Sequence, residues 1–185
     1  MPKMYNMTDE ADHSTEDQRK LMTIGRTAVD ITEDDDNVYL ADWVIPKGGT
    51  KADGEERRRI VWEMYEIWKT ENPSQKRINK SIVKGVDTEI CVEKLLISEV
   101  ALHAYSNFRN VIALYYLDSI LKVAKLVKNS DLISQKQKKY FKGGYMAELH
   151  ATIQAKPYFE KAKLMVGVTR KKERIMYSVT AMDIK

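Results

Sequence analysis

Three segments near the end of the chain alternate between apolar and polar residues with a period of two. They run from Tyr145 to Ala155, from Phe159 to Thr169 and from Arg174 to Ile184. Such alternation predicts β-strands with one packed face and one open face, and the short connections favour an antiparallel meander. The residues expected on the packed face are Tyr145, Ala147, Leu149, Ala151, Ile153, Ala162, Leu164, Val166, Val168, Ile175, Tyr177, Val179 and Ala181.

Apolar residues at helical spacing precede these strands. Steps of three and four predict a helix from Glu55 to Thr70, with Asp53 as its N-cap. A second helix is expected over residues 98–107 with Ser98 as its N-cap, and a third, the most hydrophobic, from Phe108 to Lys128. We therefore expect an α+β fold in which N-terminal helices pack on one face of a C-terminal antiparallel sheet.

Composition suggests one domain that follows an acidic N-terminal segment, here called the acidic lead. Residues 1–36 are expected to be partly disordered, and residues 37–185 to form a single α+β domain, with strands over Asn37 to Ile45 and Thr88 to Lys94. Cys91 is the single cysteine, which excludes an internal disulfide, and it is expected to be a buried thiol. No secretory signal or membrane-spanning run is recognisable, so a cytoplasmic location is expected.

The net charge of +4 is distributed unevenly along the chain. Residues 1–40 carry a net charge of −6, residues 41–100 are balanced, and residues 101–185 carry +10. A C-terminal half this basic attracts polyanions, and nucleic acid is the first to consider. An ordinary solvated basic surface would give the same count.

A lysine-rich loop and the open face of the predicted sheet hold the candidate chemistry. The loop, residues 136–142, carries Lys138, Lys139 and Lys142 with interleaved aromatic residues, a composition that suits a phosphate backbone and a stacked base. Residues on the open face include His150, Thr152, Lys163, Ser178 and Thr180. Histidine suits proton transfer, because its unperturbed pKa of about 6.5 lies near neutrality.

Several stretches together carry a resemblance to a known fold. They are SEVALHAYSN with His103, LDSILKVAKLV (117–127), Tyr145 and the final stretch 163–184. In the order helix, helix, lysine-rich loop and antiparallel sheet, the chain resembles the barnase–EndoU–colicin E5/D–RelE-like nuclease fold, as found in phages and mobile elements of Bacteroidetes-type bacteria. The resemblance covers roughly residues 55–185 and places a nuclease-like core at about 88–185.

This resemblance implies a ribonuclease that works without metal, or a catalytically inactive relative. Such enzymes use the 2′-hydroxyl of RNA as nucleophile and need a base, an acid and cations for the phosphorane charge. His103 matches the helix histidine of the fold, and Ser178 and Thr180 match polar positions on its last strand. Arg170 and the lysines Lys138, Lys139, Lys142 and Lys163 are the candidates to bind phosphate, while His150 is added from its place on the open face.

Two other classes of function remain open from the sequence. The same sheet could bind nucleic acid without cleaving it, or a surface such as the helix with Trp62 and Trp68 could dock a partner or inhibitor protein. No cofactor and no metal site are expected, since HExxH, paired cysteines and a GxxxxGK[ST] loop are absent. The acidic run Glu33 to Asp36 lacks the spacing of an EF-hand and is interpreted as a loop.

Overall fold

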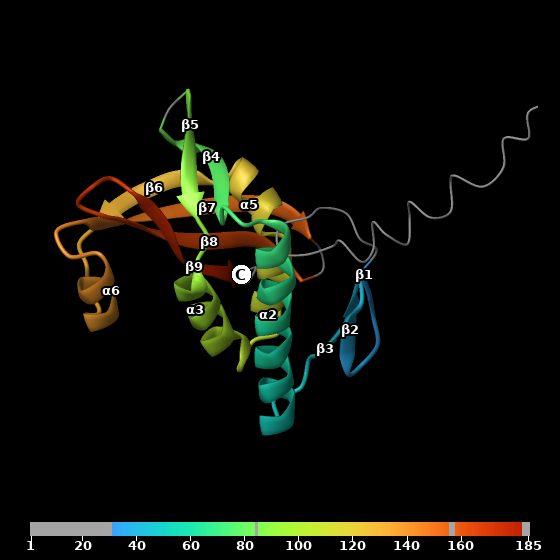
Figure 1. The fold of residues 1–185 in the computed structure, drawn as a ribbon. Helices are drawn as coiled ribbons and strands as arrows, with labels where there is room; N and C mark the ends of the chain where they lie inside the picture. The colour runs from blue at the N-terminus through green and yellow to red at the C-terminus, as the bar shows by residue number, and fades with distance from the viewer. Residues whose placement is uncertain (1–30, 84, 156–157, 183–185) are drawn as a thin grey trace, which may run out of the picture.

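The computed structural model describes residues 31–185 except 84, 156–157 and 183–185 (Figure 1). The predicted acidic lead therefore lies almost wholly outside the described residues. A small antiparallel sheet begins the described chain, with β1 (Ile31–Glu33), β2 (Asn37–Leu40) and β3 (Trp43–Pro46) in that order. The single strand expected from Asn37 to Ile45 is thus a hairpin, because the chain reverses at Ala41 and Asp42.

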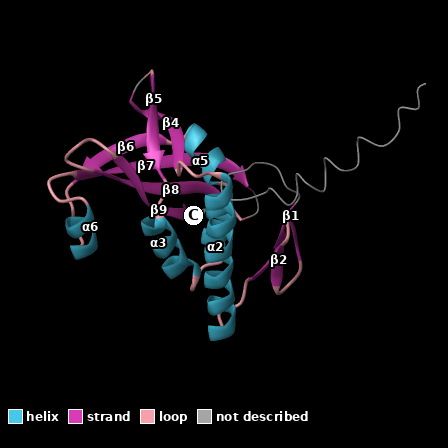
Figure 2. Ribbon diagram, in the orientation of Figure 1, coloured by secondary structure: helices cyan, strands magenta, loops and turns pink. Residues whose placement is uncertain are grey.

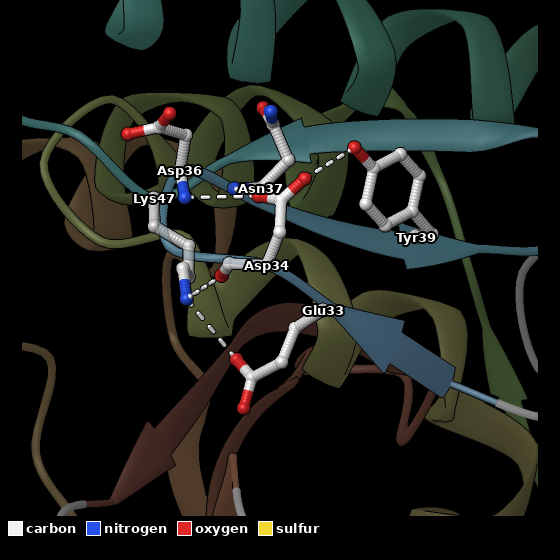
Figure 3. Close-up of polar contacts among 6 residues, drawn as sticks. All are labelled: Glu33, Asp34, Asp36, Asn37, Tyr39 and Lys47. Atoms are coloured by element: carbon white, nitrogen blue, oxygen red, sulfur yellow. Dashed lines mark hydrogen bonds and ion pairs between the residues drawn. The ribbon is translucent and has the colours of Figure 1, made fainter.

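Hydrogen bonds from the chain itself hold the acidic loop between β1 and β2 (Figure 3). The Asp34 carboxylate accepts from the backbone N–H of Asp36 (2.9 Å) and Asn37 (2.7 Å) and from the Tyr39 hydroxyl (2.5 Å). These bonds, led by that from Tyr39, lower the pKa of Asp34. Lys47 pairs with Glu33 at 3.2 Å. The carboxylates of Glu33 and Asp34 therefore already have partners within this hairpin.

The long helix α2 (Lys51–Glu71) follows the hairpin. Thr50, rather than the predicted Asp53, is its N-cap; Asp53 instead completes a capping box by accepting from the Thr50 backbone N–H. The apolar stripe is buried as expected, and its members include Ile60, Val61, Met64 and Trp68. The fully buried Arg57 ties α2 to its neighbours by donating to four backbone carbonyls, those of Pro46, Gly48, Ala104 and Tyr105.

The main sheet has six strands in the order β4-β5-β9-β8-β7-β6. Their bounds are β4 Lys76–Val83, β5 Val86–Cys91, β6 Lys125–Ser130, β7 Tyr145–Ala155, β8 Phe159–Val168 and β9 Arg174–Met182. The predicted α+β class and the last three strands are confirmed. The sheet is mixed, however, since β5 runs parallel to β9, where Cys91 pairs with Ile175. It also curls, so that β4 contacts β6 (Figure 1).

Four helices contribute to the core on one side of this sheet, here called the inner side. They are α2, α3 (Lys94–Ala104), α4 (Arg109–Tyr115) and α5 (Leu117–Val123). A fifth described helix, α6 (Gln135–Tyr140), lies between β6 and β7 in the chain, so the helices do not all precede the sheet (Figure 2). The single helix expected from Phe108 to Lys128 is instead two short helices, α4 and α5, separated at Tyr116, and the prediction is wrong beyond Val123, where the chain extends at Ala124 and forms β6.

The start of the second predicted helix also differs. Ser98 lies inside α3, where its hydroxyl donates to the Leu95 carbonyl, and the helix begins four residues earlier after Glu93. A polar side chain in the middle of a helix can form this local bond, so its presence alone does not mark a helix start. The predicted lysine-rich loop is partly the helix α6, which Ser134 caps.

A β-bulge in β9 changes which residues face the core. Met165 pairs with Ser178 and Val166 pairs with Met176, which leaves Tyr177 as the extra residue. Val179 and Ala181 face the inner core as predicted, but Met176 replaces Tyr177 there. Tyr177 instead joins a second cluster with Leu95, Phe141 and Met146 on the opposite side of the sheet, here called the outer side.

Phe141, which follows α6, covers part of the outer side. Its ring lies where a Cβ on Gly167 would project, and Gly167 pairs with Met146 on the neighbouring strand. An ion pair between Lys136 and Glu99 joins α6 to α3. The outer side is therefore covered near the start of β7, while the part around His150 is more open. This corrects the expectation that helices cover only one face.

Candidate functional site

Four polar side chains occupy one row across the open part of the outer side. Lys125 of β6 pairs with His150 of β7, His150 pairs with Lys163 of β8, and Lys163 pairs with Thr180 of β9. Neighbouring strands lie about 4.8 Å apart, so this outer row spans about 14 Å. The predicted candidates His150, Lys163 and Thr180 are thus brought together on adjacent strands, because each alternates with a buried residue, Leu149, Leu164 and Val179.

A carboxylate that the sequence did not single out lies beside this row. Glu148 and His150 occupy alternate positions of β7, and the Glu148 Oε1 is 2.7 Å from the His150 Nε2. Lys128 pairs with the other carboxylate oxygen at 3.6 Å. Burial raises the pKa of Glu148, but the hydrogen bond with His150 and the charges of Lys128, His150 and Lys163 outweigh it, so the pKa is lowered overall. Glu148 is therefore an ionised partner for the imidazole at neutral pH.

A hollow of about 600 Å³ opens at the β6 end of the row. The end of α5, the start of β6, the middle of β7 and the curled strand β4 enclose it, and the residues that line it are Lys80, Ser81, Lys122, Val123, Ala124, Lys125, His150 and Thr152. Of the described residues that line it, none is acidic. We call this the basic hollow.

Local structure explains why three lysines meet in the basic hollow. The buried Asn79 of β4 donates to the Leu121 carbonyl of α5 and accepts from the Ser81 and Ile82 backbone N–H groups. These bonds hold Lys80 and Ser81 beside the end of α5. The turn at Ala124 then places Lys122 and Lys125 on either side of a buried alanine. The sequence prediction missed these lysines because it placed Lys122 and Lys125 inside one continuous helix.

Ser178 lies on the outer side, two positions before Thr180, but it is only 8% exposed. It pairs with Met165, a member of the second apolar cluster, next to the bulge at Tyr177. Ser178 is therefore part of the same face as the outer row, at the edge of the area covered by Phe141.

The remaining sequence candidates lie elsewhere. His103 is exposed in the last turn of α3, whose end Arg57 ties to α2. No hydrogen bond or ion pair of the described residues joins its imidazole to His150, Lys163, Ser178 or Thr180. The structure thus gives His103 no contact with the outer row.

The basic residues predicted to bind phosphate separate into two places. Lys163 belongs to the outer row. Lys138 and Lys139 are exposed on α6, Lys142 follows that helix, and Arg170 packs its aliphatic part against Gly143 in the neighbouring turn. This turn lies beyond Tyr145, five residues from His150 along β7, or about 17 Å at 3.3 Å per residue. Arg170 therefore does not share the basic hollow.

The site offers proton transfer and phosphate binding, but little base stacking. Glu148 and His150 can exchange a proton, and the lysines supply ammonium groups for an oxyanion. Phe141, one of the aromatic residues expected to stack on a base, is 1% exposed and packs in the second cluster, whereas Tyr140 is 53% exposed. Within the described part of the chain, no three His, Cys, Asp or Glu side chains gather as metal ligands would.

Comparisons with protein families, with curated proteins and with solved structures gave no match to this chain. The resemblance to the nuclease fold therefore stays a prediction from the sequence. Of the helices in the described residues, none is both long and apolar enough to cross a membrane.

Proposed function

We propose that this protein binds RNA on the outer side of its sheet, with a backbone phosphate in the basic hollow. The observation that carries the proposal is the lining of that hollow: Lys80, Lys122 and Lys125 converge with His150, and no described acidic residue lies among them. Ammonium groups grouped around a concave surface favour a polyanion, and binding of such a ligand depends strongly on salt. The Thr152 hydroxyl of the hollow can donate to a phosphate oxygen, whereas the Ser81 hydroxyl already donates to the Asn79 side chain at 2.5 Å.

The pairing of charges supports this proposal. Among the described residues, no carboxylate forms an ion pair with Lys122, Lys125 or Lys163, although Lys80 pairs with Asp87 at 3.4 Å. Because no described carboxylate pairs with the ammonium groups of Lys122, Lys125 and Lys163, their charge is not offset locally and is available to attract an anionic ligand. The resemblance to the nuclease fold, whose members act on RNA, points the same way, and the expected cytoplasmic location would give access to RNA.

Fluorescence anisotropy with a labelled single-stranded RNA of 12 nucleotides tests the proposal. Each of Lys122→Gln and Lys125→Gln should weaken binding and lower the slope of log K against log salt by about 0.7, the value for one lost phosphate contact on a single strand. Lys69→Gln removes an equal charge from α2, where Lys69 pairs with Glu66 at 2.9 Å, and should leave affinity unchanged. Equal losses in all three variants, or no binding in the wild type, would refute the proposal.

A second candidate function is cleavage of that RNA without metal, and the Glu148–His150 pair favours it. In the reaction, Glu148 would take the proton of the 2′-hydroxyl, whose oxygen forms a bond to phosphorus as the bond to the 5′-oxygen breaks. Protonated His150 would give its proton to that leaving oxygen, and Lys163 would offset the charge on the phosphoryl oxygens. The substrate would have to enter between the two side chains, which contact each other at 2.7 Å.

Incubation of labelled RNA with the protein in excess EDTA separates the two functions. If the protein cleaves, His150→Ala and Glu148→Gln should each abolish cleavage while RNA binding persists, and His103→Ala should cleave like the wild type. Binding without cleavage in the wild type would reject the enzyme and keep the RNA-binding protein. Loss of cleavage in His103→Ala alone would show that the Glu148–His150 pair is not the catalytic group.

A further inference from the structure

A second hollow lies at the fork where β5 separates from β9. β5 pairs with β4 along much of its length, but it pairs with β9 only through Cys91 and Ile175. Beyond that point the connection between β8 and β9 faces the edge of β5 across a hollow of about 430 Å³. Its polar lining includes Lys76, Thr88, Lys171, Lys172, Glu173 and Arg174. We call this the fork hollow.

Two buried polar atoms of the fork hollow have no hydrogen-bond partner in the described part of the protein. They are the hydroxyl oxygen of Thr88, a residue only 3% exposed, and the Nε of Arg174. Arg174 makes one hydrogen bond, from its Nη1 to the Lys172 carbonyl at 3.4 Å. Buried polar groups are normally hydrogen-bonded, so these two atoms have bonding capacity left for a ligand in the fork hollow.

The charges of the fork hollow favour an anion. Two of its three carboxylates are neutralised within the chain, since Glu89 pairs with Lys76 at 2.9 Å and Asp87 pairs with Lys80 at 3.4 Å. Lys171 and Arg174 then outnumber Glu173, which leaves an excess of positive charge, while the Lys172 ammonium lies 5.6 Å from the centre of the Tyr145 ring. A guanidinium with a nearby hydroxyl is suited to the several acceptor oxygens of a phosphate group.

We infer that the fork hollow is a second phosphate site and that the RNA bound in the basic hollow also reaches it. The second part of this inference rests on the proposed function. Thr180, at the β9 end of the outer row, lies six residues from Arg174 along β9, about 20 Å at 3.3 Å per residue, and the basic hollow lies at the other end of that row, about 14 Å further on. A stacked strand advances about 3.4 Å per nucleotide, so an RNA that follows β9 and then the outer row between the two hollows needs about ten nucleotides. The ligand class is therefore a polynucleotide, and shorter fragments occupy one hollow only.

Anisotropy with RNAs of 3 and 12 nucleotides tests this inference. Arg174→Gln and Lys171→Gln should weaken binding of the 12-mer and lower its salt slope by about 0.7, and should weaken the 3-mer much less, because a 3-mer can still bind in the basic hollow. Lys171 is exposed, so its variant addresses charge without disturbing the core. Arg58→Gln is the matched control on α2, where Arg58 pairs with Glu55 at 3.8 Å. Equal weakening of both RNAs, or an unchanged 12-mer, would overturn the shared ligand.

Pyrophosphate alone tests the fork hollow without RNA. In ¹H–¹⁵N spectra of the full chain, pyrophosphate should shift the Arg174 Nε–H signal, and Thr88→Val should reduce the shift. A signal that does not move up to millimolar pyrophosphate would reject the phosphate site. If neither RNA binds but pyrophosphate still shifts the signal, the proposed function and the shared ligand are refuted, while the phosphate site in the fork hollow stands.

Discussion

Helix α2 and the outer side of the sheet use positive charge in opposite ways. On α2, Arg58, Arg59 and Lys69 pair with carboxylates of the same helix, and Arg57 is buried among four carbonyl oxygens. On the outer side, no described carboxylate forms an ion pair with Lys125 or Lys163. The positive charges on α2 are therefore paired within the fold, while those of the outer row are available to bind a ligand. The comparison predicts that substitutions on α2 change stability and that substitutions on the outer row change binding.

Replacement of Arg57 should produce the largest loss of stability. Arg57→Met fills similar volume but leaves the carbonyls of Pro46, Gly48, Ala104 and Tyr105 without this donor. A hydrogen bond from a charged group contributes about 1.5–3 kcal/mol, and the contributions of the four bonds are not additive. We therefore expect the free energy of unfolding to fall by at least about 3 kcal/mol. Urea denaturation measures it.

Arg58→Met provides the matched control for Arg57. Its ion pair with Glu55 is solvent-exposed and lies at 3.8 Å, so its removal should change stability by less than about 1 kcal/mol. Similar stability in the two variants would mean that the hydrogen bonds from Arg57 to the four carbonyls contribute little. The proposal that positive charges on α2 stabilise the fold would then be wrong.

Gly167→Val should give the next largest effect, on the covered part of the outer side. A Cβ at Gly167 would meet the Phe141 ring, and forced overpacking of a core costs about 1–3 kcal/mol. Thermal unfolding should show the loss, and the double variant with Phe141→Ala should be more stable than the sum of the two single losses predicts, because Phe141→Ala removes the clash. If the double variant is less stable than the sum of the single variants predicts, Phe141 is not the obstacle.

Local patterns predicted the last three strands because apolar residues recur at every second position along much of each strand. The same alternation placed His150, Lys163 and Thr180 on one face, and antiparallel pairing then made them neighbours. The bulge at Tyr177 was not predictable, because Ile175, Tyr177 and Val179 continue the apolar alternation without a break. Only pairing with β8 shows that Tyr177 is the extra residue.

Sequence reasoning failed where tertiary contacts override local preference. Residues 108–128 have the apolar content of one helix, yet Lys125 to Ser130 pair with β7 as an edge strand. That error concealed the basic hollow, since the turn at Ala124 is what brings Lys122 and Lys125 beside Lys80 from β4. The parallel contact between β5 and β9, and with it the fork hollow, depends on residues more than eighty positions apart and left no local signal.

Lys163→Gln should affect binding and leave stability nearly unchanged. Lys163 lies between His150 and Thr180 in the outer row, and no described carboxylate forms an ion pair with it. We expect a fall of about 0.7 in the salt slope for single-stranded RNA and a change in unfolding free energy within about 0.5 kcal/mol. Lys69→Gln should leave the salt slope of RNA binding unchanged. If the Lys163 variant has a lower free energy of unfolding but binds RNA normally, then Lys163 stabilises the fold and does not contact RNA, contrary to the comparison with α2.

The smallest effect should come from replacement of Glu148, which should change the free energy of unfolding by an amount that depends on pH. The pKa of Glu148 is lowered from its ordinary value of 4.5, because the hydrogen bond with His150 and the charges of Lys128, His150 and Lys163 outweigh the cost of burial. A carboxyl whose pKa is lower in the folded protein binds its proton more readily when unfolded. Its contribution to stability is therefore complete above about pH 4.5 and is lost as the pH falls through the folded value.

Glu148→Gln removes this titration and keeps the shape of the side chain. The wild type should be more stable than the variant at pH 6, and the difference should shrink as the pH falls below 4.5. Urea denaturation at a series of pH values measures the difference directly, so that Asp34, whose pKa is also lowered, cancels between the two proteins. A difference that stays constant from pH 6 to pH 3 would show that the folded protein does not lower the pKa of Glu148, and that the hydrogen bond with His150 and the nearby lysines do not outweigh the cost of burial.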